Sequence, residues 1–237
     1  MRKIIFAIIF CSILSLGASS RTFDGTNDEI DFGNVVNIGT GNVSLCSWAK
    51  LTEDAGADII LGKISNAAGT AAGYVLRQNA SDIIHVIASD ATDTASCQTG
   101  TDLDDSWFFV CLLWDATSKT VYAYTNGSLD CSATNTDVGS LSNSVSLQAG
   151  ETSSDGDDLT GSLAYQVIHS TKIYTDWEMS QMQWLPGTIV DSINGFFPYW
   201  GNSPEIDLSG NGLSGTVAGS SITIDGPPIM FGGGLIL

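Results

Sequence analysis

The chain has 237 residues, of which 26 are acidic and 8 are basic, giving a formal net charge of -18 at pH 7. This balance excludes nucleic-acid binding as the main function, because such binding needs clustered Lys and Arg side chains that displace counterions from phosphates. Asp makes up 21 of the 26 acidic residues, and 26 residues are Gly, a composition typical of turns rather than helix interiors. Length and composition therefore predict one β-rich domain with many loops.

Residues 1–20 have the pattern of a signal peptide for export. The basic start MRK is followed by an apolar run over residues 4–16 and by small residues suited to cleavage. We expect cleavage after Ser20, so that residues 21–237 form a single mature domain that is secreted, held at the cell surface or released into the periplasm. A retained membrane anchor is the alternative, but the run is shorter than the roughly 20 residues that cross a bilayer. No membrane span is therefore expected after cleavage.

Short apolar or alternating runs, separated by Gly, Asn, Asp and Ser, predict β-strands through most of the mature chain. The clearest runs cover residues 43–51, 59–64, 73–78, 83–88, 107–114, 120–125, 144–149 and 162–169. Their spacing is typical of an antiparallel β-sandwich or jelly roll, so the predicted fold class is all-β. Asn126 and Gly127 follow one of these runs and predict a tight hairpin turn, because both residues tolerate positive φ.

One short helix is expected over residues 175–182. Thr175 and Glu178 have capping-box spacing, in which the Thr hydroxyl accepts from a first-turn amide and the Glu carboxylate accepts from the cap amide. A strand segment at 195–225 and a Gly-rich tail at 226–237 then close the chain. The sequence leaves open whether this tail is frayed or acts as a docking strand.

Two motifs at opposite ends of the chain carry a resemblance to a known family. Residues 23–32 read FDGTNDEIDF, and residues 199–200, YW, are followed by DLSGNGLSGTV at 207–217. Both resemble laminin G-like jelly-roll domains of the concanavalin A-like lectin and glucanase superfamily, in which the second motif commonly precedes the first. The swapped order predicts a circular permutation that brings the last strands beside the strand at 23–32, since domain termini usually lie close together. A truncated second repeat is the alternative.

Other motifs look catalytic but lack the partners that their chemistry needs. Residues 29–34, EIDFGN, resemble the start of the Glu-x-Asp-x-x-Glu strand of laminarinase and licheninase glycosidases, but Asn34 replaces the acid/base carboxyl. Retaining hydrolysis needs two carboxyl groups about 5–5.5 Å apart. Residues 210–215 match a dinucleotide fingerprint but lack the helix that should follow, which predicts a glycine turn. His85 and His169 are expected to be packed or hydrogen-bonded in strands. We expect no enzymatic activity.

Acidic loops indicate calcium as a candidate cofactor, because calcium takes six to eight hard oxygen ligands. An acidic stretch precedes the predicted strand that should run beside the N-terminal strand, and the resemblance implies calcium on such rims. The candidate ligands are Asp24, Asp28, Asp155, Asp157 and Asp158. The alternative is a set of solvated turns, since Asp-rich turns are common.

Aromatic side chains are the candidate ligand-binding groups. Tyr122 and Tyr124 share one face of their predicted strand, because side chains alternate with a period of two. On a concave face their rings would stack against sugars, and we add Trp114 on the neighbouring strand as a third candidate. The alternative is that these rings pack in the core.

Four cysteines remain after the expected cleavage, and an exported chain permits disulfides. Cys97 and Cys131 lie in polar stretches and are predicted to pair with each other. Cys46 and Cys111 lie in apolar runs, where they either pair or remain buried thiols. The alternative is that all four are free.

The sequence as a whole predicts a secreted, non-catalytic recognition module that binds a glycan or an extracellular protein, with calcium as the candidate cofactor. A second hypothesis is a structural protein that self-assembles into a surface, filament or virion and uses the same sandwich as a building block. A degenerate glycoside hydrolase is the third.

Overall fold

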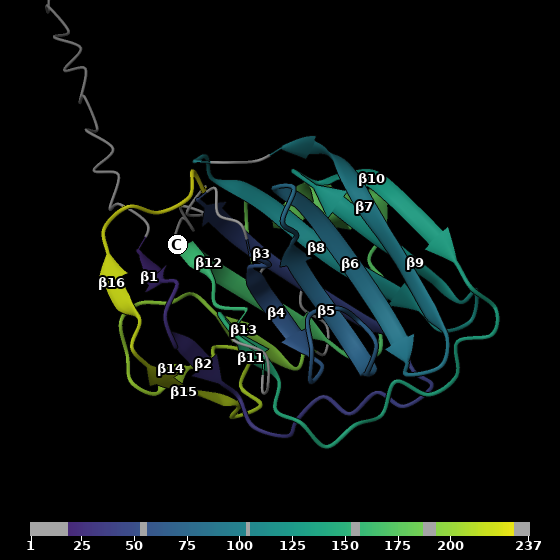
Figure 1. Cartoon of the computed structure of the whole chain (residues 1–237). Helices are drawn as coiled ribbons and strands as arrows, with labels where there is room; N and C mark the ends of the chain where they lie inside the picture. Colours follow the sequence, from purple (N-terminus) through teal and green to yellow (C-terminus); the bar gives the residue numbers. More distant parts are fainter. Residues whose placement is uncertain (1–18, 53–55, 103–104, 153–156, 187–192, 230–237) are drawn as a thin grey trace, which may run out of the picture.

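The computed structural model describes residues 19–52, 56–102, 105–152, 157–186 and 193–229, which form two antiparallel β-sheets packed face to face (Figure 1). Sheet A holds, in spatial order, β10 (Ser128–Thr134), β9 (Thr120–Thr125), β8 (Phe108–Asp115), β3 (Val43–Leu51), β12 (Thr160–His169), β1 (Ser20–Asp24) and β16 (Ser221–Thr223), with β13 (Gly195–Phe197) paired to β12. Sheet B holds β14 (Glu205–Ile206), β15 (Ser214–Ala218), β2 (Glu29–Asp31), β11 (Gln148–Ala149), β4 (Ile59–Lys63), β5 (Ala72–Gln78), β6 (Ile83–Asp90) and β7 (Thr94–Asp102). The predicted all-β sandwich is confirmed.

Hydrophobic side chains are buried on both faces of sheet A, and a smaller buried cluster lies on the outer face of sheet B, formed by Ile59, Ile64, Ala67, Val75 and Ile87. The main core lies between the sheets, and a second cluster lies where α1 (Asp176–Met182) packs on sheet A through Met179 and Met182. In β5, Tyr74 and Leu76 point into the main core, so the alternation of side chains places Arg77 on the outer face of sheet B. The candidate functional site lies on this outer face.

The predicted strands agree best where the sequence is most apolar. The runs at 43–51 and 120–125 are strands with those bounds, whereas the run at 144–149 forms only the two-residue β11. β7 and β10 were missed because both are rich in Ser and Thr and lie at sheet edges, where much of β10 is exposed to water.

The predicted turn and helix are both confirmed. Asn126 and Gly127 adopt φ angles of 49° and 75° between β9 and β10, as a tight hairpin requires. Thr175 caps α1, and the reciprocal bonds between Thr175 and Glu178 form the expected capping box. The local chemistry of these two segments was therefore sufficient to place them.

The two ends of the chain meet in space, as the permutation predicts. β16 pairs with β1 and β15 pairs with β2, both antiparallel, and Figure 1 shows these C-terminal strands beside the N-terminal ones. β2 is an interior strand of sheet B, because β15 pairs with one of its edges and β11 with the other. The strand order of the jelly roll is thus completed by segments about 185 to 203 residues apart in sequence.

The run DLSGNG at residues 207–212 forms a loop held together by Asp207. Asp207 accepts hydrogen bonds from the amides of Phe196, Ser209 and Leu213, at 2.9, 2.8 and 3.1 Å. Gly210 and Gly212 have φ angles of 86° and 75°, which side-chain-bearing residues rarely adopt. The motif is therefore a structural turn, in agreement with the prediction.

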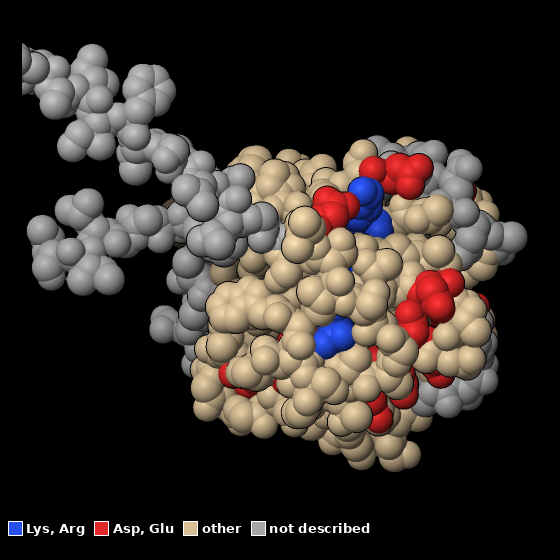
Figure 2. Space-filling model, turned by 90° about the vertical axis from the view of Figure 1, so that its left-hand side faces the viewer, with Lys and Arg blue, Asp and Glu red and all other residues tan. Residues whose placement is uncertain are grey.

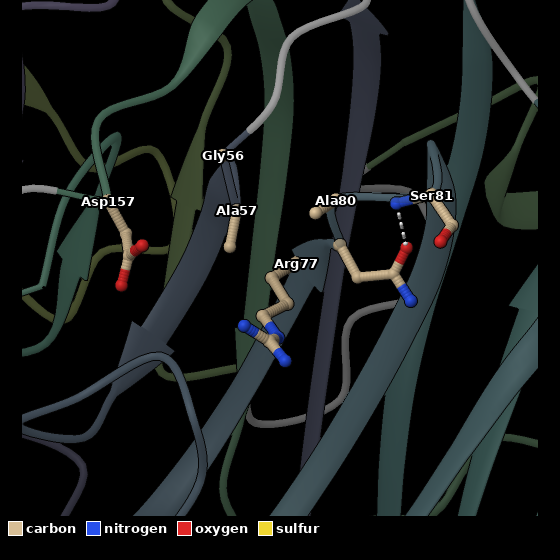
Figure 3. A pocket seen from close by; sticks show the side chains of 7 residues that line it. Gly56, Ala57, Arg77, Ala80, Ser81 and Asp157 are labelled. Atoms are coloured by element: carbon tan, nitrogen blue, oxygen red, sulfur yellow. Dashed lines mark hydrogen bonds between the residues drawn. The ribbon is translucent and has the colours of Figure 1, made fainter.

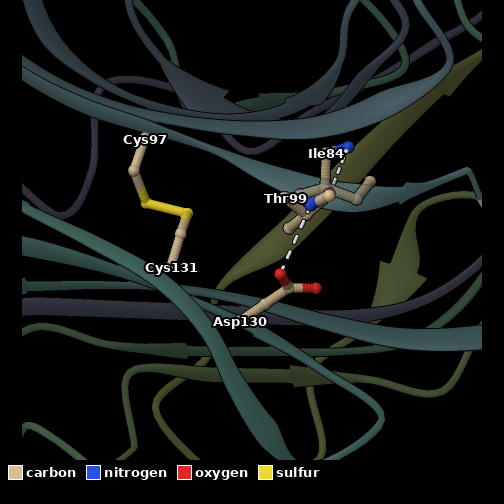
Figure 4. The surroundings of a disulfide bond; sticks show 6 residues. Ile84, Cys97, Thr99, Asp130 and Cys131 are labelled. Carbon is tan, nitrogen blue, oxygen red and sulfur yellow. Dashed lines mark hydrogen bonds between the residues drawn. A yellow bond between two sulfur atoms is a disulfide. The ribbon is translucent and has the colours of Figure 1, made fainter.

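Two disulfides join the four cysteines. Cys97 on β7 pairs with Cys131 on β10, which links the edge of sheet B to the edge of sheet A (Figure 4). Cys46 and Cys111 lie opposite each other on the adjacent strands β3 and β8 and form the second bond. The predicted Cys97–Cys131 pairing is confirmed. Cys46 and Cys111, which the sequence left as either a pair or buried thiols, form a disulfide.

The surface on the side where the chain ends meet carries no continuous basic area. Figure 2 shows isolated basic groups among neutral and acidic ones on this face. No described helix is long and apolar enough to cross a membrane.

Candidate functional site

The three predicted ligand-binding aromatics do not form an open sugar platform. Trp114 is fully buried in the main core, which removes it from the candidates because neither face of its ring is accessible. Tyr124 is nearly buried beneath α1, where its hydroxyl donates to Asp176 at 2.7 Å. Tyr122 packs against the same cluster and is half-buried. The shared face of the two tyrosines is thus the face that α1 covers.

The predicted calcium ligands are divided between two places. Asp24 ends β1 and Asp28 lies in the turn before β2, where the Asp24 amide donates to Asp28 Oδ2 at 2.9 Å. Burial raises the pKa of Asp28, and the neighbouring charges of Asp24 and Asp158 raise it further. Asp155 lies outside the described residues, and Asp157 lines a pocket on sheet B. In the part of the chain that the structure describes, no three His, Cys, Asp or Glu side chains gather as metal ligands, and the calcium site stays a prediction.

The residues of the glycosidase-like motif have structural contacts. Glu29 accepts a hydrogen bond from Gln148, and Asn34 accepts one from the buried Lys63 amine at 2.8 Å. His169 is also buried, and its Nδ1 accepts from the amides of Thr171 and Lys172. The second histidine, His85, lies instead at the pocket described next.

A pocket of about 410 Å³ opens on the outer side of sheet B, between segments that are far apart in sequence. Its lining comes from the chain before β4, from the end of β5 with the turn that follows, and from the chain before β12: Gly56, Ala57, Arg77, Asn79, Ala80, Ser81 and Asp157. Figure 3 shows Arg77 between Asp157 and the turn that carries Ala80 and Ser81. The volume is within the usual range for small-ligand sites, about 300–1,000 Å³.

Arg77 is held in place by the strand beside it. Arg77 and His85 are partners in the pairing of β5 with β6, and Arg77 Nη2 lies 3.0 Å from His85 Nδ1. Burial, with a smaller contribution from Arg77, lowers the pKa of His85 to about 4, so the imidazole is neutral at neutral pH and accepts from the guanidinium. Burial also lowers the pKa of Arg77, and the charge of Asp157 raises it in part. An arginine remains charged under these conditions.

The turn after β5 presents polar groups to the same pocket. Asn79 Oδ1 accepts from the Ser81 amide at 2.9 Å and from the Ile83 amide at 3.5 Å, which closes the turn (Figure 3). This turn also contains Asp82 with a φ of 58°. The Asn79 oxygen is therefore occupied by backbone amides, and the Asn79 amide nitrogen and the Ser81 hydroxyl supply donors at the pocket.

Sequence reasoning missed this pocket, except that it named Asp157 for a different purpose. The available signal was Arg77 itself, a charged residue at the end of a run predicted to be a buried strand.

Residues 24–176, more than half of the chain, match the family model described as the concanavalin A-like lectin/glucanases superfamily. The chain belongs to this superfamily. The match ends before the displaced segment at 195–225, which agrees with a permuted order of the concanavalin A-like strands. No curated protein matches the sequence significantly.

Solved structures share this concanavalin A-like fold at low sequence identity. A putative carbohydrate-binding protein from Bacteroides ovatus is 14% identical with a TM-score of 0.71, and the match covers 90% of this chain and 61% of that protein. The CBM40 of a Ruminococcus gnavus IT-sialidase, bound to α2,6-sialyllactose, is 12% identical with a TM-score of 0.56, covering 68% and 95%. A SAP-like pentraxin from Limulus polyphemus is 12% identical with a TM-score of 0.55, covering 71% and 83%. At these identities the comparisons show the fold alone.

Proposed function

We propose that this protein is a non-catalytic carbohydrate-binding module that acts outside the cytoplasm, with its binding site in the pocket around Arg77. The pocket carries the proposal, because it combines a charged donor, further polar groups and small Gly and Ala walls in a cavity of about 410 Å³. Similar folds from Bacteroides ovatus and Ruminococcus gnavus are described as carbohydrate-binding, which supports the same use of this sandwich. The export-like start and the two disulfides support a site of action in an oxidising compartment.

The test is a glycan array followed by calorimetric titration of the glycans that are retained. We expect the wild-type protein to retain at least one glycan and Arg77→Met to lose it. Lys119→Met is the matched control, because it removes the same charge from the β8–β9 turn, away from the pocket lining. Failure of the wild type to retain any glycan contradicts the function. Retention that Arg77→Met leaves unchanged contradicts the location of the site.

Calcium remains part of the proposal as a candidate cofactor near Asp28, although Asp24, Asp28 and Asp158 do not gather as a three-carboxylate ligand set in the described structure. The support is their proximity, since the charges of Asp24 and Asp158 both act on Asp28. Thermal unfolding in the presence of calcium and of a chelator tests this point. Equal melting temperatures in the two conditions contradict a bound ion, because a ligand that binds only the folded state raises its stability.

A second candidate function is assembly of many copies of the chain. The edge strand β16 is exposed, with Ile222 at 41% and the adjacent Ile224 at 89% of their accessible surface. An exposed apolar edge strand favours pairing with another copy. Light scattering tests this function. If the chain assembles through this edge, the wild type forms large particles and Ile224→Lys does not.

A further inference from the structure

We infer that the pocket around Arg77 selects a sugar that bears a carboxylate, with the guanidinium of Arg77 binding the carboxylate and Asp157 accepting from the sugar hydroxyls. This inference rests on the proposed function and names the chemical class of its ligand.

The first argument is that Arg77 differs from Arg21, the other arginine of residues 21–237, because only Arg21 forms an ion pair with a described carboxylate. The other basic side chains each have a structural partner: Arg21 with Glu205, Lys50 with Asp225, Lys172 with Glu178, Lys63 with Asn34 and Val145, and Lys119 over the Trp114 ring. Among the described residues, no carboxylate forms an ion pair with Arg77. The charge of Asp157 acts on Arg77 without an ion pair between the two, so the guanidinium has a neutral partner, His85, and a carboxylate nearby in the pocket.

The second argument is the hydrogen-bonding capacity that Arg77 leaves unused. A guanidinium has five N–H donors, and its contact with His85 engages only one edge of the group. The Nε–H is buried, and no described residue accepts a hydrogen bond from it. Other buried polar atoms of the described residues also lack a partner, so the Nε–H alone does not identify a ligand, and it is the edge of the guanidinium facing the pocket that indicates one. The planar fork of arginine matches a carboxylate with two parallel bonds.

The third argument concerns the rest of the lining. The described lining holds no aromatic side chain, so a neutral sugar gains no ring stacking there and relies on polar contacts. Donors outnumber acceptors, because Arg77, Asn79 and Ser81 can all donate while Asp157 is the carboxylate of the set. A sugar with both a carboxylate and hydroxyls satisfies this arrangement better than one with hydroxyls alone.

The net charge of -18 does not oppose this ligand at close range. Charges beyond about 8 Å are largely screened at physiological ionic strength. Long-range repulsion therefore slows the encounter more than it weakens the contact, which is decided by groups that touch the ligand. Hydrogen bonds between a guanidinium and a carboxylate are about twice as strong as neutral ones.

Matched pairs of sugars test the inference by calorimetric titration. The probes are sialyllactose against lactose, and cellobiouronic acid against cellobiose, so that the two arms distinguish sialic acids from uronic acids as the source of the carboxylate. We expect wild-type protein to bind the acidic member of one pair about tenfold more tightly or better, because a charge-assisted contact replaces a neutral one. Added salt should weaken this binding, since the contact is between charges.

Variants then connect the preference to Arg77. Arg77→Met should abolish the preference for the acidic member, and Arg77→Lys should keep only part of it, because lysine lacks the fork. Lys119→Met should keep it in full. Circular dichroism of each variant shows whether the fold is intact.

Equal binding of both members by the wild type overturns the inference and leaves the proposed function standing. Binding of no member of either pair also overturns it, and the glycan array described above then decides separately whether any sugar is bound. A preference that survives in Arg77→Met overturns the role of this side chain.

Discussion

Arg21 and Arg77 carry the same guanidinium group in opposite surroundings. Arg21 is 4% exposed, and its nitrogens donate to Glu205, to Ser220 and to the Asn202 carbonyl where the chain ends meet. Arg77 contacts one neutral imidazole beside a pocket, and no described residue accepts from its buried Nε–H. A guanidinium whose donors are all used within the protein stabilises the fold, whereas one with unused donors can bind a ligand.

Lys63 is an intermediate case that helps to define the comparison. It is buried like Arg21, but its amine donates to the neutral acceptors Asn34 and Val145. Burial lowers the pKa of Lys63 to about 8, because no carboxylate compensates the lost solvation. The effect of a buried cation on the stability of this fold therefore depends on whether its partner is a carboxylate or a neutral acceptor.

The largest expected effect is on the Arg21–Glu205 pair. Arg21→Met leaves the Glu205 carboxylate, which is 1% exposed, buried without its cation. Breaking a buried pair from one side costs about 3–5 kcal/mol. We expect the free energy of unfolding, measured by denaturant titration, to fall by this amount.

The matched control is the double variant Arg21→Met/Glu205→Leu, which removes both charges. It should recover part of the lost stability, since burial of an unpaired charge, rather than the loss of the pair itself, causes most of the cost. A loss below about 1 kcal/mol in the single variant, the range of surface pairs, is incompatible with Arg21 as a structural residue.

The next effect concerns Lys63 and depends on pH. With a pKa of about 8 in the folded protein and about 10.4 in the unfolded chain, the unfolded chain binds more protons between these values. The stability of the wild type should therefore rise with pH from 8 to 10, by about 2–3 kcal/mol at most. Lys63→Met should lack this rise, whatever its stability at pH 7.

Measurement by chemical denaturation at each pH compares the two slopes. The range stops at pH 10, because burial raises the pKa of Tyr74 and stability falls once tyrosines ionise in the unfolded chain. Parallel curves for wild type and Lys63→Met would show that the amine is solvated in the folded state.

The sequence predicted the fold better than the site, for a physical reason. Local signals specify the capping box at Thr175 and the turn at Asn126, and the two end motifs predicted which strands meet. The period of two showed that Tyr122 and Tyr124 share a face, but which face is open depends on where α1 packs. The pocket joins residues near 57, 77 and 157, a juxtaposition that exists only after folding.

The smallest expected effect on stability is that of Arg77→Met, and it decides the comparison. The variant removes the contact with His85, which costs about 0.5–1.5 kcal/mol, but it also removes a buried donor that has no acceptor among the described residues. These terms offset each other, so the free energy of unfolding should change by less than about 1 kcal/mol. Denaturant titration beside Lys119→Met measures it under identical conditions. A loss as large as that of Arg21→Met would mean that Arg77 serves the fold, and its unused donors would then no longer point to a ligand.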